Sequence, residues 1–421
     1  MRKKTVVILG CMDTKGEEYG YVKSHVERGG CATLIIDVGV VDPPTLLPDI
    51  TREEVARAGG EDFGNLLSEG PTRERISPVM AKGAAAVVTR LIGEDRAHGI
   101  ISCGGTQGST LAALVMQELP VGFPKLLVST MASGNTANLV GIKDITMMFS
   151  VADIMGLNRV SRKILGRAAG AICGMASVEI EQESDERPLV AITTVGITTP
   201  GAMKAKEVLT EAGFDTIVFH AVGTGGRAME SLMKEGQING VIDLATIEVV
   251  QEMLGGYLAG SPERMTVATR LGIPQVICPG AVTCNTFGPP ETIPERFKGR
   301  QAVRHSALYT NVRTNADELR ALAKVQADRV NPGLGPIEWL IPMKGFCSYS
   351  VSGGPLFNPE ADREYLNTLR RELRADIPVH VRELDINAPA FATEAAERLI
   401  AMMKGLPGGR PVGRPGGRRG V

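Results

Sequence analysis

The 421-residue sequence predicts an α/β protein made of two Rossmann-like, doubly wound domains with mostly parallel sheets. Short runs of aliphatic residues alternate with helical patterns along most of the chain. Continuous apolar strands of this kind are typical of parallel sheets that helices cover on both faces. The pattern restarts after a charged run at Glu179–Arg187, which indicates two domains joined there. Right-handed crossovers between the strands then give the doubly wound arrangement.

The first predicted domain spans residues 1–180. Its strands are aliphatic and β-branched runs, and its helices carry apolar residues at helical spacing. We expect strands at Thr5–Leu9, Thr33–Val38, Gly99–Cys103, Lys125–Ser129 and Ile145–Phe149, with helices at Glu17–Arg28, Met80–Leu91, Leu111–Leu119 and Asn158–Ala176.

The second predicted domain spans residues 188–404. The remaining segment, residues 405–421, is rich in Gly, Pro and Arg and cannot form a core, so we expect it to be disordered. Strands of the second domain are expected at Leu189–Val195, Thr216–His220, Val241–Leu244, Gln275–Cys278, Trp339–Ile341 and Val379–Val381.

The two halves carry a weak internal echo, which indicates two related domains. A proline opens one strand in each half, an Asn-Thr pair follows at the same offset, and a glycine begins the preceding strand. Chance similarity between short α/β strands is the alternative. The matching residues are Pro124 with Asn135-Thr136 and Gly99, and Pro274 with Asn285-Thr286 and Gly240.

Composition argues against several classes of function. The formal net charge is −1, so the bulk charge gives no support for binding to nucleic acid or to an anionic membrane. Five His and seven scattered Cys form no zinc-site spacing, and the odd, dispersed cysteines indicate reduced thiols. No apolar run approaches the roughly 20 residues of a membrane span. We therefore expect a cytoplasmic protein.

The loop from Gly10 to Glu17 is the first candidate ligand site, because ligands of open parallel sheets bind beyond the carboxyl ends of the strands. Gly10 permits a tight turn, and the following helix N-terminus favours a phosphate. Lys15 adds a charge-assisted contact, and Asp13 is a candidate Mg²⁺ ligand. Thr14 belongs to the same site, although Thr14 and Glu17 also fit a helix capping box.

A second candidate loop follows the strand Gly99–Cys103. Its glycines allow backbone N–H groups to approach an anion, and its hydroxyls can bind the anion's oxygens. It matches neither the Walker A loop nor G-x-G-x-x-G. The composition favours a phosphate cradle over a plain turn. The residues concerned are Gly104, Gly105, Thr106, Gly108, Ser109 and Thr110.

Two further features complete the predicted nucleotide site of the first half. Asp37 ends a strand, where an acid can bond a ribose hydroxyl, and it fits a cap equally well. The loop after Lys125–Ser129 is small and polar, and it is expected to complete the pocket or to contact a base or sugar. An ordinary capped helix start is the alternative. The residues assigned from this loop are Ser133, Gly134, Asn135 and Thr136.

In the second half, the turn from Gly223 to Ala228 formally matches G-x-G-x-x-A, and Asp243 lies 20 residues after Gly223. That is the dinucleotide fingerprint, but it follows the second strand of its half, where the fingerprint follows the first. We expect an anion site here, with Arg227 available for bidentate contact and His220 as a general acid or base. A purely structural histidine is the alternative.

The segment Gly280–Pro290 is long and irregular. With Asn285 and Thr286 at a strand end it is a candidate for lining a second pocket, and thiol chemistry at Cys284 stays open. The sequence has no G-x-S-x-G elbow, so acyl transfer by a serine nucleophile lacks support.

Taken together, these motifs resemble one family. The turn at Gly10–Lys15, the loop at 104–110, Ala132–Thr136 and the block His220–Glu230 are similar to the ATP-binding family typified by the N-terminal region of the tomato mosaic virus resistance protein. The similarity covers about residues 4–403. It implies a pair of Rossmann-like domains, ATP bound with Mg²⁺ in the first half, and a homodimer.

We therefore expect an ATP-binding (Mg-nucleotide-binding) protein that acts as a metabolic enzyme on a small phosphorylated or carboxylated substrate between the two domains. His220 and Arg227 are the residues expected at the chemistry. Two alternatives stay open: an NAD-dependent oxidoreductase, and a non-catalytic, nucleotide-regulated interaction protein.

Overall fold

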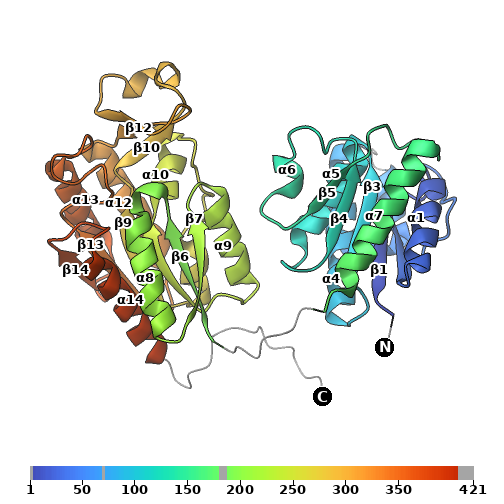
Figure 1. Cartoon of the computed structure of the whole chain (residues 1–421), viewed down its shortest axis with the longest axis horizontal. Coiled ribbons are helices and arrows are strands. Elements are labelled where there is room, and N and C mark those ends of the chain that lie inside the picture. The colour runs from blue at the N-terminus through green and yellow to red at the C-terminus, as the bar shows by residue number, and fades with distance from the viewer. Residues whose placement is uncertain (1–2, 69–71, 180–186, 406–421) are drawn as a thin grey trace. The chain divides into compact units, whose positions relative to one another are not determined.

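The computed structural model describes residues 3–68, 72–179 and 187–405. The chain forms two compact units, Met1–Glu183 and Ser184–Val421, each with its own cores (Figure 1). Most of the charged run Glu179–Arg187 lies outside the described residues. So does the segment predicted to be disordered, 405–421, apart from Gly405.

The first unit is built on a five-stranded parallel sheet with the order β2-β1-β3-β4-β5. Its strands are β1 (Thr5–Gly10), β2 (Ala32–Asp37), β3 (Gly99–Gly104), β4 (Lys125–Ser129) and β5 (Thr146–Phe149). Its helices are α1 (Gly16–Arg28), α2 (Arg52–Gly59), α3 (Phe63–Ser68), α4 (Arg73–Gly93), α5 (Thr106–Glu118), α6 (Ala137–Val140) and α7 (Arg159–Ser177).

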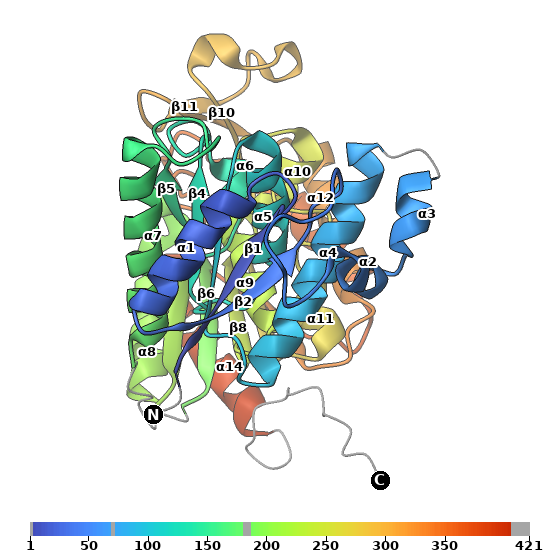
Figure 2. The same cartoon turned by 90° about the vertical axis from the view of Figure 1, so that its right-hand side faces the viewer.

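Alternate residues of each strand face opposite helical layers, as the period of a strand requires. In β1, Val7 and Leu9 pack with α2, α4 and α5, whereas Val6 and Ile8 pack with α1 and α7. Figure 2 shows α1 and α4 on this unit. Both faces are covered by helices, which confirms the predicted α/β class.

The second unit contains a six-stranded parallel sheet with the order β14-β13-β9-β8-β6-β7. One face packs with α8 and α14, which lie side by side in Figure 1, and the other with α9 to α13. Its strands are β6 (Leu189–Thr194), β7 (Asp215–His220), β8 (Gly240–Ala245), β9 (Gln275–Gly280), β13 (Ile337–Pro342) and β14 (Val379–Arg382). Its helices are α8 (Thr199–Glu211), α9 (Thr224–Lys234), α10 (Ile247–Leu254), α11 (Thr266–Leu271), α12 (Ala316–Val330), α13 (Pro359–Glu372) and α14 (Pro389–Lys404).

Both sheets follow the same topology. Counted from the start of each unit, the strand order is 2-1-3-4-5, and the second sheet adds a sixth strand at its edge. This is the flavodoxin-like member of the doubly wound class, in which the strand order reverses between the first and third strands. The reversal leaves a crevice at the carboxyl ends of those two strands, which is where such folds bind ligands.

The registers of the two sheets also correspond. Gly99 lies opposite Val6 in the first unit, as Gly240 lies opposite Val190 in the second. The Ile100 N–H donates to the Pro124 carbonyl at 2.9 Å, and the Val241 N–H donates to the Pro274 carbonyl at 2.9 Å. The glycine and proline parts of the predicted echo are therefore structurally equivalent.

The Asn-Thr part of the echo is not equivalent. Asn135 precedes the short helix α6, whereas Asn285 lies within a strand of a small antiparallel sheet. The sequence patterns did not predict this sheet, because its strands have only three or four residues. Its strands are β10 (Cys284–Phe287), β11 (Ala302–Arg304) and β12 (Thr310–Arg313), in the order β10-β12-β11.

The helix α4 is longer than the helix predicted at Met80–Leu91, and it is strongly apolar. Within the described residues, Glu74–Gly93 is long and apolar enough to cross a membrane by length and composition. Half of this apolar stretch is buried, and Met80, Ala84 and Val88 lie in the core that also contains residues of β1 and β2. Packing in the core therefore accounts for its apolar character.

Candidate functional site

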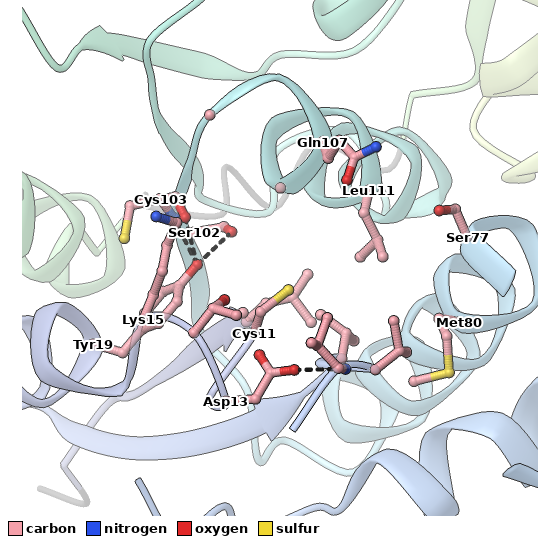
Figure 3. Close-up of a pocket in the computed structure, with 18 of the residues that line it drawn as sticks. Cys11, Asp13, Lys15, Tyr19, Ser77, Met80, Ser102, Cys103, Gln107 and Leu111 are labelled. Carbon is pink, nitrogen blue, oxygen red and sulfur yellow. Dashed lines mark hydrogen bonds between the residues drawn. The ribbon is translucent and has the colours of Figure 1, made fainter. Parts of the chain in front are cut away.

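A cavity of about 790 Å³ lies at the carboxyl ends of β1 and β3, where the strand order of the first unit reverses (Figure 3). One part of its wall is polar and comes from the loops after β1 and β3. Another part is apolar and comes mainly from the segment after β2 and from α4. The polar part includes Asp13, Thr14, Lys15, Thr106 and Gln107, and the apolar part includes Val38, Val40, Val41, Ile76, Met80 and Leu111.

The loop after β1 brings Thr14 and Lys15 to the cavity. Lys15, not Thr14, occupies the position before the first turn of α1, and no side chain caps that end. The predicted capping box of Thr14 and Glu17 therefore does not form, and the exposed Thr14 is available to a ligand. The Lys15 ammonium donates one hydrogen bond to the Ile154 carbonyl oxygen, which leaves two of its three donors for a ligand.

Gly10 has a packing role that the sequence did not reveal. A Cβ added there would lie 2.0 Å from the ring of Tyr19. The Tyr19 hydroxyl donates to the Cys103 carbonyl at 2.6 Å and accepts from the Cys103 N–H at 3.2 Å (Figure 3). Burial raises the pKa of Tyr19 well above its ordinary value, so the ring is a neutral link between α1 and the end of β3.

Asp13 and Asp37 differ in their access to the cavity. Asp37 is fully buried and does not line the cavity. Its Oδ1 accepts hydrogen bonds from the N–H groups of Met12 at 2.9 Å and Gly39 at 2.8 Å. It stabilises the loops after β1 and β2, so the predicted ribose contact is not supported. Asp13 does line the cavity, and its Oδ2 accepts from the Val41 N–H at 2.9 Å.

The other carboxylate oxygen of Asp13 is the candidate cation ligand. Asp13 Oδ1 is buried, and the described chain gives it no hydrogen-bond partner. Within the described residues, no three His, Cys, Asp or Glu side chains gather into a metal site. A divalent ion here would therefore have one protein carboxylate oxygen and would need most of its ligands from water or phosphate, as Mg²⁺ commonly does.

The loop after β3 presents the N-terminus of α5 to the cavity. Gly105 precedes the first turn, no side chain caps that end, and the turn contains no acidic residue. A Cβ added at Gly105 would meet its nearest neighbours, Asp153 Oδ1 and Thr130 Oγ1, at the ordinary van der Waals distance of 3.9 Å. The first-turn amides of Thr106, Gln107 and Gly108 have no intrahelical acceptor and carry the positive end of the helix dipole.

The remaining residues assigned to this loop do not reach the cavity. A Cβ on Gly104 would lie 3.0 Å from the Cα of Gly108, so Gly104 is small because the loop folds tightly. The Ser109 hydroxyl is buried and bonds to the Gly104 carbonyl and the Ser129 hydroxyl. The Thr110 hydroxyl donates to the Thr106 carbonyl inside the helix. Of the six predicted residues, Gly105, Thr106 and Gly108 line the cavity.

The loop at 133–136 does not complete the cavity as expected. Ser133, Gly134 and Asn135 are exposed, and neither they nor Thr136 are among its lining residues. The Asn135 side chain accepts from the Ala137 N–H at 3.1 Å and so orders a turn before α6. The loop after β5 supplies the missing wall instead, through Asp153.

Cys11 is a further lining residue that the sequence reading did not assign. Burial, and then the nearby charges of Asp13 and Asp37, raise the pKa of its thiol to about 12. The thiol is therefore protonated at neutral pH and serves as part of the wall rather than as a nucleophile.

The equivalent crevice of the second unit is filled by the chain itself. Glu248 Oε1 accepts from the N–H groups of Gly223 at 2.6 Å and Gly226 at 3.1 Å. Its other oxygen pairs with Arg264 Nε at 2.7 Å, and both side chains are buried. The anion expected in the Gly223–Ala228 turn is thus a carboxylate of this protein, which corrects the prediction of a free anion site.

The prediction of a dinucleotide site at this turn finds no support in the contacts of the described residues, for the same reason. Asp243, the candidate ribose ligand, is buried and forms two hydrogen bonds of 2.7 Å with the Arg264 guanidinium. It also accepts from the Thr193 hydroxyl at 2.7 Å. An NAD molecule would have to displace both Glu248 and this buried network.

His220 and Arg227 are not assembled into a catalytic pair. Both side chains are exposed at the end of β7 and the start of α9. Arg227 Nε donates to the Gly223 carbonyl at 3.1 Å, and the described residues give the His220 ring no hydrogen-bond partner. The predicted catalytic roles therefore find no support in the contacts of these two residues.

Cys284 faces Cys347, with 3.8 Å between the two sulfurs, and both are fully buried. Hydrogen bonds from Cys284, Thr283 and Ser350 lower the pKa of Cys347 to about 6, while that of Cys284 is raised well above its ordinary value. Asn285 and Thr286 are buried in β10 and line none of the described cavities. The expected role of Asn285 and Thr286 in lining a second pocket therefore finds no support in the cavities of the described residues.

Comparison with known proteins agrees with this two-unit arrangement. A family model described as "Uncharacterised protein family (UPF0261) N-terminal domain" matches residues 4–181, and the model of its C-terminal domain matches residues 187–403. The chain belongs to the UPF0261 family.

Relatives from bacteria span nearly the whole UPF0261 chain. A UPF0261 protein of Clostridium tetani is 42% identical over 403 residues, covering 95% of this chain and 99% of the relative. A Rhizobium meliloti relative is 38% identical, covering 93% and 97%. The ToMV susceptible protein tm-1(GCR26) of Solanum lycopersicum is 30% identical over 94% of this chain, which spans 55% of the plant protein.

Among solved structures, the UDP-GlcNAc 2-epimerase of Methanocaldococcus jannaschii is 9% identical, with a TM-score of 0.23 over 66% of this chain and 83% of that chain. The Rickettsia bellii enzyme is 10% identical, with a TM-score of 0.23 over 95% and 96%. At this TM-score the fold assignment of the UPF0261 chain rests on its own strand orders.

Proposed function

We propose that the first unit of this UPF0261 protein binds a nucleotide as its Mg²⁺ complex, and that the nucleotide is ATP. The observation that carries the proposal is the uncapped N-terminus of α5, which faces a cavity of about 790 Å³ beside Lys15. Cavities of several hundred Å³ are the usual size for small ligands and cofactors. The choice of ATP among the nucleotides rests on the similarity of the loops to an ATP-binding family.

The phosphates would bind at the polar part of the cavity. The first-turn amides of α5 and the ammonium of Lys15 are the positive groups there, and the bare Gly105 lets an anion approach the backbone closely. The first turn of α1 is less suited, because it carries Glu17 and Glu18. The Glu18 carboxylate already accepts from the Gly156 N–H at 2.7 Å.

The base would bind at the apolar part. Val40, Val41 and Met80 are among the side chains that line it, and none of them offers a polar group to distinguish one base from another. Adenine, as the less polar purine, suits such a wall. GTP provides the comparison that tests this preference.

Mg²⁺ fits the residues present. Asp13 is one of the residues that line the cavity, and its Oδ1 is a buried carboxylate oxygen without a partner among the described residues. When bound, the ion would neutralise phosphate charge. Two carboxylates, Asp13 and Asp153, line the cavity beside the single ammonium of Lys15, so free ATP would be repelled more than its Mg²⁺ complex.

Isothermal titration calorimetry of the full chain with ATP, with and without Mg²⁺, tests the proposal. We expect saturable binding at millimolar or lower concentration that requires Mg²⁺ and is weaker for GTP. The absence of heat with Mg·ATP in the millimolar range would overturn the proposal.

The wider proposal is a cytoplasmic homodimer that uses the nucleotide either in a metabolic reaction or to regulate its contacts. The family resemblance supports the dimer, and light scattering of the purified chain with and without Mg·ATP tests it. A mass equal to one chain under both conditions would remove the dimer from the proposal.

A further inference from the structure

A second cavity of about 340 Å³ adjoins the nucleotide cavity. It lies at the carboxyl ends of β3, β4 and β5, and it shares Gly105, Thr106 and Asp153 with the first cavity. The wall common to both cavities consists of Gly105, which has no side chain, together with Thr106 and Asp153. A molecule in the second cavity would therefore lie next to the phosphate end of the first.

The loop that carries Asp153 is strained. Val151 has a φ of 64°, which is rare for a β-branched residue, and the Ala152 N–H donates to the Ser150 carbonyl at 2.7 Å across it. The two features together form a γ-turn of the strained type. The Val151 side chain is 63% exposed, so burial of this side chain does not compensate for the strain. Strain of this kind concentrates at functional sites.

Several contacts fix this strained loop in place. The Ser150 N–H donates to the Ser129 carbonyl at 3.1 Å, and the Ser150 hydroxyl donates to the Ala152 carbonyl at 2.7 Å. On the other side, the Ile154 side chain is buried and its carbonyl accepts from Lys15. The loop is therefore held at both ends, with Asp153 between them.

Asp153 does not cap α5, although it lies beside the N-terminus of that helix. Its Oδ1 accepts from the Ile154 N–H at 2.8 Å, and the described chain gives Oδ2 no partner. Asp153 is an exposed carboxylate. One of its oxygens is thus available as a hydrogen-bond acceptor in the wall common to both cavities.

The lining of the second cavity indicates the class of its ligand. Thr106 and Thr130 contribute hydroxyls, Phe149 and Val151 contribute exposed apolar surface, and Asp153 is its charged side chain. Among the described residues, no Lys, Arg or His lines this cavity, so they offer no cationic side chain to pair with a phosphate or carboxylate. A neutral molecule with hydroxyl groups fits these residues.

We propose that this cavity binds a neutral polyhydroxylated acceptor, and that Asp153 is the base for phosphoryl transfer to it; this proposal rests on the nucleotide binding proposed above. The acceptor hydroxyl oxygen forms a bond to the terminal phosphorus of ATP, and the bond from that phosphorus to the bridging oxygen breaks. ADP leaves with the electron pair of that bond. The hydroxyl proton passes to Asp153 Oδ2. Phosphoryl transfer uses an aspartate in this way in other folds.

The test separates binding from turnover. Calorimetry with Mg²⁺ and a non-hydrolysable ATP analogue, AMPPNP, measures binding, and chromatography of the nucleotides measures ADP formation with water alone and with glycerol, glucose and myo-inositol as probes. We expect Asp153→Asn to bind Mg·AMPPNP as well as the wild type, or more tightly because a negative charge is lost. We expect its ADP formation to fall about 100-fold or more. Asp328→Asn, an exposed change in α12, is the matched control and should leave both readouts unchanged.

Three results would overturn the assignment of Asp153. These are unchanged ADP formation in Asp153→Asn, loss of AMPPNP binding in that variant, and absence of ADP formation by the wild type with every probe while AMPPNP binds. The last result removes only the transfer reaction. If the wild type does not bind Mg·AMPPNP, the nucleotide-binding proposal itself fails, and the transfer reaction with it.

Discussion

Glu248 Oε1 accepts a hydrogen bond of 2.6 Å from the backbone N–H of Gly223, so a carboxylate of this chain occupies the glycine-rich turn of the second unit. The registers of the two sheets identify the residue of the first unit that is equivalent to Glu248. Glu248 lies eight residues after Gly240, and Gln107 lies eight residues after Gly99, its structural equivalent. A neutral amide lines the open cavity of the first unit, while a charged group fills the corresponding crevice of the second.

Removal of Glu248 should destabilise the second unit. In Glu248→Ala, the buried Arg264 loses one of its acid partners, and two backbone N–H groups lose their acceptor. Breaking a buried pair on one side costs about 3–5 kcal/mol. Trp339 is the single tryptophan of the chain and is fully buried in this unit, so its fluorescence in a urea titration reports the unfolding free energy.

The matched control is Glu252→Ala, one turn further along α10. It removes a partly exposed pair with Arg329 and should cost about 1 kcal/mol or less. Equal losses in the two variants would contradict the role of Glu248.

Glu230 should make the stability of the second unit depend on pH. Burial raises its pKa from 4.5 to about 7, and its Oε1 accepts from the Met265 N–H at 2.9 Å. Because the folded pKa lies above the unfolded value, the stabilisation is fully present below the unfolded pKa and is lost as the pH rises through about 7. Glu230→Gln keeps the acceptor oxygen and removes the titration.

Between about pH 5 and pH 8, the unfolding free energy of the wild type should therefore fall by roughly 2 kcal/mol relative to Glu230→Gln. The exposed Glu397→Gln variant should follow the wild type. Parallel pH profiles for the wild type and Glu230→Gln, followed by Trp339 fluorescence, would show that Glu230 does not titrate in this range.

Lys15 should contribute to nucleotide affinity. Lys15→Met keeps the aliphatic stem and removes the ammonium that faces the cavity. A hydrogen bond to a charged group contributes about 1.5–3 kcal/mol, so we expect Mg·ATP to bind roughly 10- to 100-fold more weakly. Lys23→Met, in the helix α1 that follows Lys15, removes an exposed pair with Glu27 and should leave the affinity unchanged. Equal affinity in all three chains would place the phosphates elsewhere.

Gly105 and Gly10 should respond differently to a side chain. At Gly105 a Cβ would make only ordinary van der Waals contacts, at 3.9 Å, and φ is −75°, so Gly105→Val should change the unfolding free energy by about 1 kcal/mol or less. The same side chain would stand where phosphates bind, and nucleotide affinity should fall at least tenfold, which calorimetry would measure. If Gly105→Val binds Mg·ATP normally, the phosphates do not bind at the N-terminus of α5.

At Gly10 a Cβ would overlap the Tyr19 ring, so Gly10→Ala should lower the melting temperature of the first unit.

Much of the fold could be predicted from the sequence. The strands of both parallel sheets are buried aliphatic runs, and each long run, such as Lys125–Ser129, became a strand within one or two residues of the expected bounds. The small antiparallel sheet was missed because its strands have only three or four residues, and β11 also has an exposed-intermediate-exposed pattern, which carries no signal of a core strand.

The candidate site could be predicted in part. Gly10, Asp13, Thr14, Lys15, Gly105, Thr106 and Gly108 line one cavity, as the rule for strand ends predicts. The contribution of Asp153 was not predictable, because it depends on how a strained loop after β5 turns back toward α5. The filling of the second glycine-rich turn by Glu248 is a tertiary contact across 25 residues, which a local motif cannot reveal.

The stoichiometry of Mg·ATP binding tests the central claim most directly, because it asks whether the first unit is open and the second closed. Calorimetry of the full chain should give one nucleotide per chain, with binding weakened by Lys15→Met and unchanged by Lys23→Met. Two nucleotides per chain, or none in the millimolar range with Mg²⁺ present, would contradict the account.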